Sequence, residues 1–197
     1  MAKVLILSNG HGEDFSGAIL GKLLLKSGHE VNALPLVGIG QSYINEHIKI
    51  IINTKQFSTG GLGYTSIKGR LTELIQGQIF YLLKNIFILL KTSIKYDLII
   101  AIGDVIPILA AWLTYKPTVV YLVAYSSHYE GKLQLPWPCK PCLSSKKVIK
   151  IFSRDKLTSD DLSSQLNRTI NFVGNPFMEP FLKPKEKLPH CSLRLGL

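Results

Sequence analysis

Short, continuous runs of apolar residues alternate along this chain with stretches in which apolar residues recur at helical spacing. The short runs are rich in Val, Ile and Leu, and each predicts a buried β-strand. They cover residues 4–7, 31–34, 48–52, 98–102, 118–124, 148–152 and 170–173. Helical patterns occur at 15–24, 66–95, 105–114 and from 158 onward. Apolar strands that alternate with helices form parallel sheets covered on both faces, so we predict an α/β domain with a doubly wound, Rossmann-like parallel sheet.

Local signals indicate where the helices begin and end. Lys26, Ser27 and Gly28 place a cation and then a glycine at the end of the first helix, which is the usual order at a helix stop. Pro107 is tolerated in the first turn of the helix at 105–114. Residues 158–161, Thr-Ser-Asp-Asp, have a capping-box pattern and predict that the last helix opens there.

Ligands of a doubly wound sheet bind beyond the carboxyl ends of its strands, where the strand order reverses. These ends correspond to residues 8–14, 103–104, 125–128, 153–155 and 174–175, and we expect the functional site to be built from these loops. The residues expected to bind substrate are Ser8, Asn9, Gly10, Gly12, Gly103, Tyr125, Arg154 and Asn175. The candidate catalytic residues are Asp104, His11, Glu13 and Asp14.

The loop at 8–14, Ser-Asn-Gly-His-Gly-Glu-Asp, combines glycines with two acids and a histidine. Its glycines let backbone approach a ligand, and the following helix N-terminus offers free N–H groups. The dinucleotide fingerprint is absent, because Phe15 occupies the position of the third glycine and no acid closes the second strand, which argues against a nicotinamide-dependent dehydrogenase. One acid would suffice to cap the helix, so the second acid and the histidine indicate a catalytic or substrate-orienting role.

Asp104 follows a buried strand at the same edge of the predicted sheet. An acid in this position can cap the next helix. Partly desolvated in a cleft, it can also act as a general base. The sequence leaves both interpretations open.

Charge is unevenly distributed along the 197 residues, whose formal net charge is +10. Residues 67–150 hold eleven Lys and Arg against four acids, and this basic stretch is also the most apolar part of the chain. A basic, apolar segment favours an anionic membrane surface over nucleic acid. Its alternatives are solvated surface lysines and, for the helical stretch from Leu74 to Lys95, a core helix.

Targeting and metal-binding signals are weak. The first apolar run ends at Leu7, too early for a signal peptide, and the segment from Leu74 to Ile94 is interrupted by polar residues, so we expect a cytoplasmic protein, peripheral at most on the inner membrane face. Cys139 and Cys142 form a single C-x-x-C without a second pair or nearby histidines, which falls short of a zinc site. We expect no metal and no cofactor.

Six motifs, at 8–14, 35–38, 60–61, 102–105, 153–158 and 172–178, stand in the order of the cyanobacterial lipid-A-disaccharide synthase-related family, which the chain resembles over nearly its whole length. That family is similar to lipid-A-disaccharide synthase and, more distantly, to the peptidoglycan N-acetylglucosaminyltransferase. The first loop departs from the lipid-A enzyme, whose Gly-Glu-x-Ser-Gly-Asp matches here only at Asp14 and Gly17-Ala18. The acceptor therefore need not be a lipid A precursor.

The resemblance implies the N-terminal half of a GT-B fold, in which two Rossmann-like domains flank the active site. By this resemblance, 1–176 is the acceptor-side domain, and 177–197 is a linker and the start of a missing donor-binding domain. The chain would bind a lipid-linked or sugar acceptor for hexosyl transfer from a nucleotide sugar. The alternative is a catalytically inactive fragment, or an acceptor-binding subunit that needs a separate donor-domain chain, so enzymatic activity of the chain alone stays open.

Overall fold

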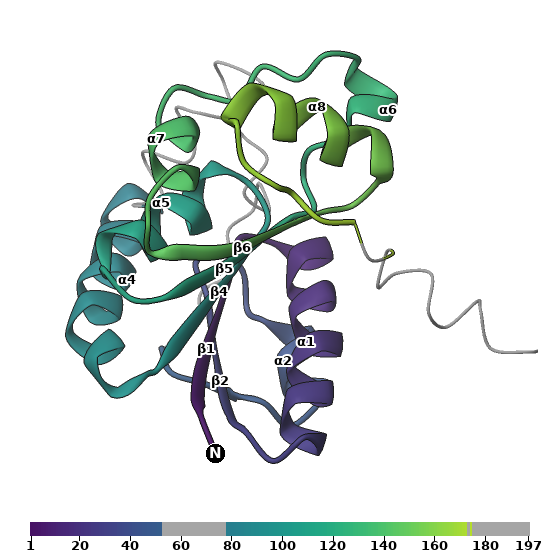
Figure 1. The fold of residues 1–197 in the computed structure, drawn as a ribbon. Coiled ribbons are helices and arrows are strands. Elements are labelled where there is room, and N and C mark those ends of the chain that lie inside the picture. The colour runs from purple at the N-terminus through teal and green to yellow at the C-terminus, as the bar shows by residue number, and fades with distance from the viewer. Residues whose placement is uncertain (53–77, 173, 175–197) are drawn as a thin grey trace, which may run out of the picture.

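The computed structural model describes residues 1–52, 78–172 and 174, which fold around one six-stranded sheet (Figure 1). Its strands are β1 (Lys3–Ser8), β2 (Glu30–Pro35), β3 (Lys49–Ile50), β4 (Leu98–Ile102), β5 (Thr118–Leu122) and β6 (Val148–Ser153). They lie in the order β3-β2-β1-β4-β5-β6, and every neighbouring pair is parallel. This confirms the doubly wound α/β fold expected from the sequence.

The predicted seventh strand is present only as a single bridge among the described residues. Asn171 pairs in parallel with Phe152 of β6. Its amide donates to the carbonyl of Ile151 at 2.9 Å, and its carbonyl accepts from the amide of Ser153 at 2.9 Å. The chain therefore returns alongside β6 after its last described helix.

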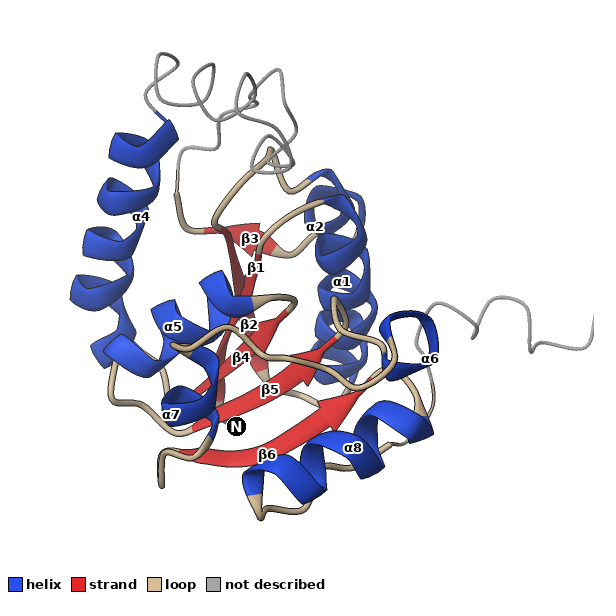
Figure 2. Cartoon of the chain, turned by 90° about the horizontal axis from the view of Figure 1, so that it is seen from above, coloured by secondary structure: helices blue, strands red, loops and turns tan. Residues whose placement is uncertain are grey.

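Helices cover both faces of the sheet (Figures 1 and 2). One face carries α1 (His11–Lys26) and α2 (Gln41–Asn45), and the other carries α4 (Gln78–Thr92), the 3₁₀ helix η2 (Ser93–Lys95), α5 (Val105–Leu113) and α7 (Cys139–Leu143). Near β6, α6 (Ser127–Glu130) and α8 (Lys156–Leu166) pack against each other. The predicted helix at 66–95 is described only from α4 onward.

Every strand except β3 contributes side chains to two separate hydrophobic cores, because successive side chains of a strand point to opposite faces. In β1, Val4 and Ile6 join the core under α1, whereas Leu5 and Leu7 join the core shared with α4, α5 and α7. Both faces of the sheet are therefore apolar along most of each strand, which explains why the strands appear in the sequence as continuous apolar runs.

Two of the three predicted helix ends are confirmed. Gly28, with φ of +82°, ends the turn after α1, and Pro107 sits in the first turn of α5. The prediction for α8 was wrong: the helix begins at Lys156, and the Asp155 carboxylate caps it by accepting from the Thr158 amide at 2.7 Å. The Thr158 hydroxyl is already used, since it accepts from the Ser127 amide at 2.8 Å.

The hydropathy of the helices bears on membrane insertion. Within the described ranges, none of the helices is both long enough and apolar enough to cross a bilayer.

Candidate functional site

The candidate site lies at the carboxyl ends of β1 and β4, which are neighbours in the sheet although far apart in the sequence (Figure 1). From β1 the chain adds β2 and β3 on one side and then crosses over to place β4 on the other. The helices that follow, α1 and α5, cover opposite faces. This is the topological switch point, where open α/β sheets bind their ligands.

Glu13, in the first turn of α1, reaches back over the end of the sheet to the loop that follows β4. Its Oε2 accepts from the Asn9 amide at 2.6 Å. Its carboxyl group also lies so close to Gly103 that a Cβ at Gly103 would overlap it. Gly103 has φ of +129°, a conformation that residues with side chains rarely adopt, so the backbone favours glycine there, and a side chain would push the Glu13 carboxyl group aside.

Asp104 occupies the other side of the same site. Its Oδ1 accepts from the Ile106 amide at 2.9 Å, so it is the N-cap of α5. The side-chain amide of Asn9 donates to both of its oxygens, at 3.2 and 3.1 Å. Asn9 therefore bridges the two acids: its backbone holds Glu13 and its side chain holds Asp104.

Burial raises the proton affinity of both carboxyl groups, and the charge of Asp104 adds to the effect at Glu13. Burial is the largest cause that raises the pKa of Glu13 to about 8, and the charge of Asp104 raises it further. The backbone amide of Asn9 opposes this rise. Burial also raises the pKa of Asp104, while its hydrogen bonds to Ile106 and Asn9 lower it.

This arrangement suits a single proton transfer near neutral pH. Glu13 titrates close to pH 8, so it can both take up and release a proton under ordinary conditions. Asp104 is held in place by three hydrogen bonds from Asn9 and Ile106. The Oδ1 of Asn9 is buried and has no hydrogen-bond partner among the described residues, which leaves an acceptor beside the two acids.

Asp14 faces the interior, unlike Glu13. It is only 2% exposed, and its Oδ1 accepts from the Ser8 hydroxyl at 2.6 Å. The Ser8 oxygen in turn accepts from the hydroxyl of Tyr43 in α2 at 2.8 Å. This chain of buried hydrogen bonds fixes the start of α1 and thereby the position of Glu13. Sequence reasoning missed Tyr43, because a five-residue helix inside a glycine-rich loop has no periodic pattern.

Tyr125 comes close to the acids from the loop after β5. The charge of Asp104 contributes to raising its pKa, though burial is the main cause. Its hydroxyl lies 3.8 Å from the Cys139 sulfur. Arg154, at the end of β6, instead donates to the Val123 carbonyl at 3.4 Å and lies over the ring of Tyr129. The structure therefore brings Asn9, Glu13, Gly103, Asp104 and Tyr125 together.

The remaining predicted residues fall into two groups. Gly10 is the N-cap of α1 and has φ of +148°, and Gly12 lies exposed in the first turn. His11 begins α1, but its side chain is not described. Asn175 lies outside the described residues, as do 177–197, the expected linker and start of a second domain.

The cysteines of the C-x-x-C lie in α7 and are both buried and free. Burial raises the pKa of Cys139 to about 11, so its thiol stays protonated at neutral pH. No cluster of three or more His, Cys, Asp or Glu side chains within the described part of the chain could hold a metal ion.

Comparison with solved structures identifies the fold. Anabaena HepE in complex with UDP and glucose superposes with a TM-score of 0.56 at 15% identity, over 89% of this chain and 45% of HepE. HepE in complex with UDP-glucose gives a TM-score of 0.57 at 14% identity, over 89% and 44% of the two chains. The chain thus spans less than half the length of HepE. The fold is therefore Rossmann-like and matches the N-terminal half of the GT-B fold.

Comparisons based on sequence alone found no match. No protein-family model matches the chain, and no curated protein matches it.

Proposed function

We propose that this chain is the acceptor-binding half of a GT-B glycosyltransferase, related to the lipid-A-disaccharide synthase-related proteins, and that Glu13 is its general base. The observation that carries the proposal is the pair of partly buried carboxyl groups, Glu13 and Asp104, at the switch point of this fold. A base with a pKa of about 8 can deprotonate a sugar hydroxyl as it attacks.

The proposed reaction is a single displacement with inversion. The acceptor O–H bond breaks as its oxygen bonds to the anomeric carbon of the donor, and the nucleoside diphosphate leaves with the electron pair of the broken C–O bond. Glu13 takes the proton. Asp104 positions Asn9 and, through its charge, keeps Glu13 basic. The free Oδ1 of Asn9 would accept a hydrogen bond from a second hydroxyl group of the acceptor sugar.

The donor must be held by a second domain, which the described residues do not include. HepE was solved with UDP-glucose and is about twice as long as this chain. We propose a nucleotide sugar as donor, bound by a domain that continues this chain or belongs to a separate polypeptide. The alternative function is that of a catalytically inactive fragment or an acceptor-binding subunit. The same difference in length supports it.

The acceptor is proposed to be a lipid-linked or free sugar, reached at an anionic membrane on the cytoplasmic side. The support comes from α4, which buries Asn85 and Leu89 but turns large apolar side chains outward. Phe80 and Ile94, the latter in η2, are each 76% exposed. Lys84, Lys91 and Lys95 flank this face, and the Lys91 amine lies 4.4 Å from the centre of the Phe87 ring. Exposed aromatic residues ringed by lysines are typical of interfacial helices.

Vesicle flotation tests the membrane part of the proposal. We expect the chain to float with vesicles that contain phosphatidylglycerol and to stay behind with phosphatidylcholine alone. Phe87→Ser should abolish most of this binding, whereas Ile149→Ser, at a position 53% exposed on β6, should not. Equal loss from both variants, or indifference to anionic lipid, would overturn the docking face.

The transfer reaction is tested by pairing the chain with its donor domain and supplying radiolabelled UDP-glucose or UDP-N-acetylglucosamine together with cell membranes. Glu13→Gln should lower kcat by about 10²–10⁴-fold, because the base is lost. Glu46→Gln is the matched control, since Glu46 forms an ion pair with Lys22 at 2.7 Å away from the site. Sugar transfer by the isolated chain would contradict the need for a donor domain.

A further inference from the structure

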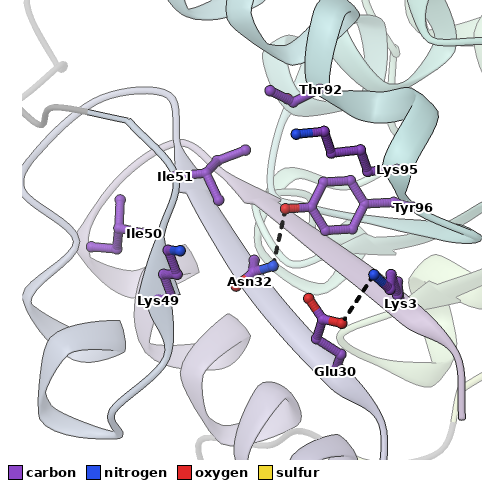
Figure 3. Close-up of a pocket in the computed structure, with 9 residues that line it drawn as sticks. All are labelled: Lys3, Glu30, Asn32, Lys49, Ile50, Ile51, Thr92, Lys95 and Tyr96. Carbon is purple, nitrogen blue, oxygen red and sulfur yellow. Dashed lines mark hydrogen bonds and ion pairs between the residues drawn. The ribbon is translucent and has the colours of Figure 1, made fainter.

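A cavity of about 350 Å³, drawn in Figure 3, lies at the amino end of the sheet, whereas the Glu13–Asp104 site lies at the carboxyl end. Its floor is formed by the first residues of β1, β2 and β3, and its wall by the end of α4, by η2 and by Tyr96. The residues that line it are Lys3, Glu30, Asn32, Lys49, Ile50, Ile51, Thr92, Lys95 and Tyr96.

The floor breaks the apolar pattern of this face of the sheet. Further toward the carboxyl end, the same face presents buried leucines such as Leu7 and Leu34. At the amino end the equivalent positions hold Lys3 opposite Glu30, and Asn32 opposite Lys49. The side chains of Lys3, Glu30 and Lys49 are exposed to solvent at this edge, so the hollow that they line is polar and charged.

The lysines carry more charge than the protein neutralises. Lys3 pairs with Glu30 at 3.4 Å. Among the described residues, Lys49 and Lys95 have no acidic partner. The four charged side chains of the cavity therefore leave a surplus of two positive charges.

Tyr96 adds a directed hydrogen-bond donor. Its side chain is 6% exposed, and Figure 3 shows it reaching toward Asn32 across the cavity. The Asn32 amide donates to the Tyr96 oxygen at 3.0 Å. The hydroxyl proton of Tyr96 therefore points elsewhere, and none of the described side chains accepts it.

We propose that this cavity binds the phosphate group of a small phosphomonoester. A phosphomonoester carries close to two negative charges and three acceptor oxygens, which match the surplus charge, the lysine amines and the Tyr96 hydroxyl. Ile51 supplies an apolar wall for the organic part of the ligand. A volume of 350 Å³ is at the small end of ligand pockets and suits a molecule the size of a sugar phosphate.

The test is a titration of the isotopically labelled chain with glycerol 3-phosphate at constant ionic strength, followed by NMR. We expect saturable shifts of the amides of Lys3, Asn32, Lys49 and Tyr96, with a Kd of about 1 mM or below. The double variant Lys49→Gln/Lys95→Gln should weaken binding by about tenfold or more, because it removes both unpaired amines. Tyr96→Phe should weaken it by a smaller factor.

Lys146→Gln/Lys147→Gln is the matched control, since it removes the same charge from exposed positions elsewhere. Its Kd should equal that of the unchanged chain. Equal weakening by both double variants would show nonspecific attraction to a basic protein and overturn the proposal. So would the absence of saturation at about 50 mM ligand.

A phospholipid headgroup presents the same chemistry, so vesicles of phosphatidylcholine with and without phosphatidic acid form a second arm. Competition of glycerol 3-phosphate with phosphatidic acid vesicles identifies a lipid source, and binding of glycerol 3-phosphate without competition identifies a soluble one. Phe87→Ser should leave the Kd for glycerol 3-phosphate unchanged, which separates this cavity from the docking face on α4. Glu13→Gln should leave it unchanged too, which separates it from the proposed active site.

Discussion

The two ends of one parallel sheet hold opposite kinds of charge in opposite surroundings. At the carboxyl end, Glu13 and Asp104 are partly buried and joined through Asn9. At the amino end, Lys49 and Lys95 are exposed, and among the described side chains they have no ion-pair partner. The difference in burial changes what each end can do.

Burial turns the acids into a proton-transfer site, because desolvation moves the pKa of Glu13 to about 8. Exposure leaves the lysines as plain positive charges, suited to attracting a phosphate rather than to chemistry. One end is therefore predicted to be sensitive to single-atom changes and the other to tolerate them.

The largest expected effect comes from Gly103→Ala. The new methyl group would overlap the Glu13 carboxyl group, and alanine is strained at φ of +129°. We expect a loss of about 3–5 kcal/mol in the free energy of unfolding. Gly131→Ala, at φ of +72° with open space around its Cβ, should lose only about 1 kcal/mol from strain. Urea unfolding of both variants measures the difference, and equal losses would contradict the close contact with Glu13.

Next in size is the pH dependence of Glu13. Its pKa is about 8 in the folded chain against 4.5 in the reference state, so its ionisation favours the unfolded chain. The stability contributed by neutral Glu13 is present below pH 4.5, falls between pH 4.5 and about 8, and then stays constant. The free energy of unfolding of Glu13→Gln, measured by urea unfolding, should therefore equal that of the unchanged chain at pH 4. At pH 9 it should exceed that of the unchanged chain by about 2–4 kcal/mol. A difference in the free energy of unfolding that stays constant between pH 4 and pH 9 would contradict the raised pKa.

A smaller effect is expected from Tyr43→Phe. The change removes only the hydroxyl that donates to Ser8 at 2.8 Å, in a fully buried position. We expect a loss of about 1 kcal/mol, seen as a lower Tm. Tyr115→Phe is the control, since Tyr115 is exposed and its loss of a hydroxyl should leave Tm unchanged.

The smallest effect belongs to the amino end. Glu30→Gln breaks the pair with Lys3, whose side chains are about half exposed, 51% and 42%. We expect less than about 0.5 kcal/mol in stability, because solvent screens such pairs. The same variant should tighten the binding of glycerol 3-phosphate, because it adds one unit to the positive surplus. A large loss of stability would mean that the two ends do not differ as described.

Much of the fold was predictable because parallel strands are buried on both faces and leave continuous apolar runs. Five of the six strands follow these runs closely, and β1 differs from its prediction by one residue at each end, whereas β3 keeps only Lys49 and Ile50 of the run at 48–52. The short helices α2, α6 and α7 were not predicted, since four or five residues cannot display a helical period.

The site was predictable in outline and not in detail. The rule that ligands bind beyond the carboxyl ends of strands pointed to Glu13 and Asp104, which do lie together. The division of roles between Glu13 and Asp14, adjacent in sequence, could not be predicted, because one side chain faces the sheet edge and its neighbour faces Ser8 in the interior. The polar floor of the amino-end cavity was not predicted either. Taken one at a time, Lys3, Glu30 and Lys49 are ordinary residues at the start of a strand.

The central claim is that Glu13 is a base poised by its surroundings, and a titration of its side-chain carboxyl by ¹³C NMR tests this directly in the chain as it stands. We predict a midpoint near pH 8, lowered in Asp104→Asn, because the neighbouring negative charge is lost. A midpoint near 4.5, or one that Asp104→Asn leaves unchanged, would contradict the account.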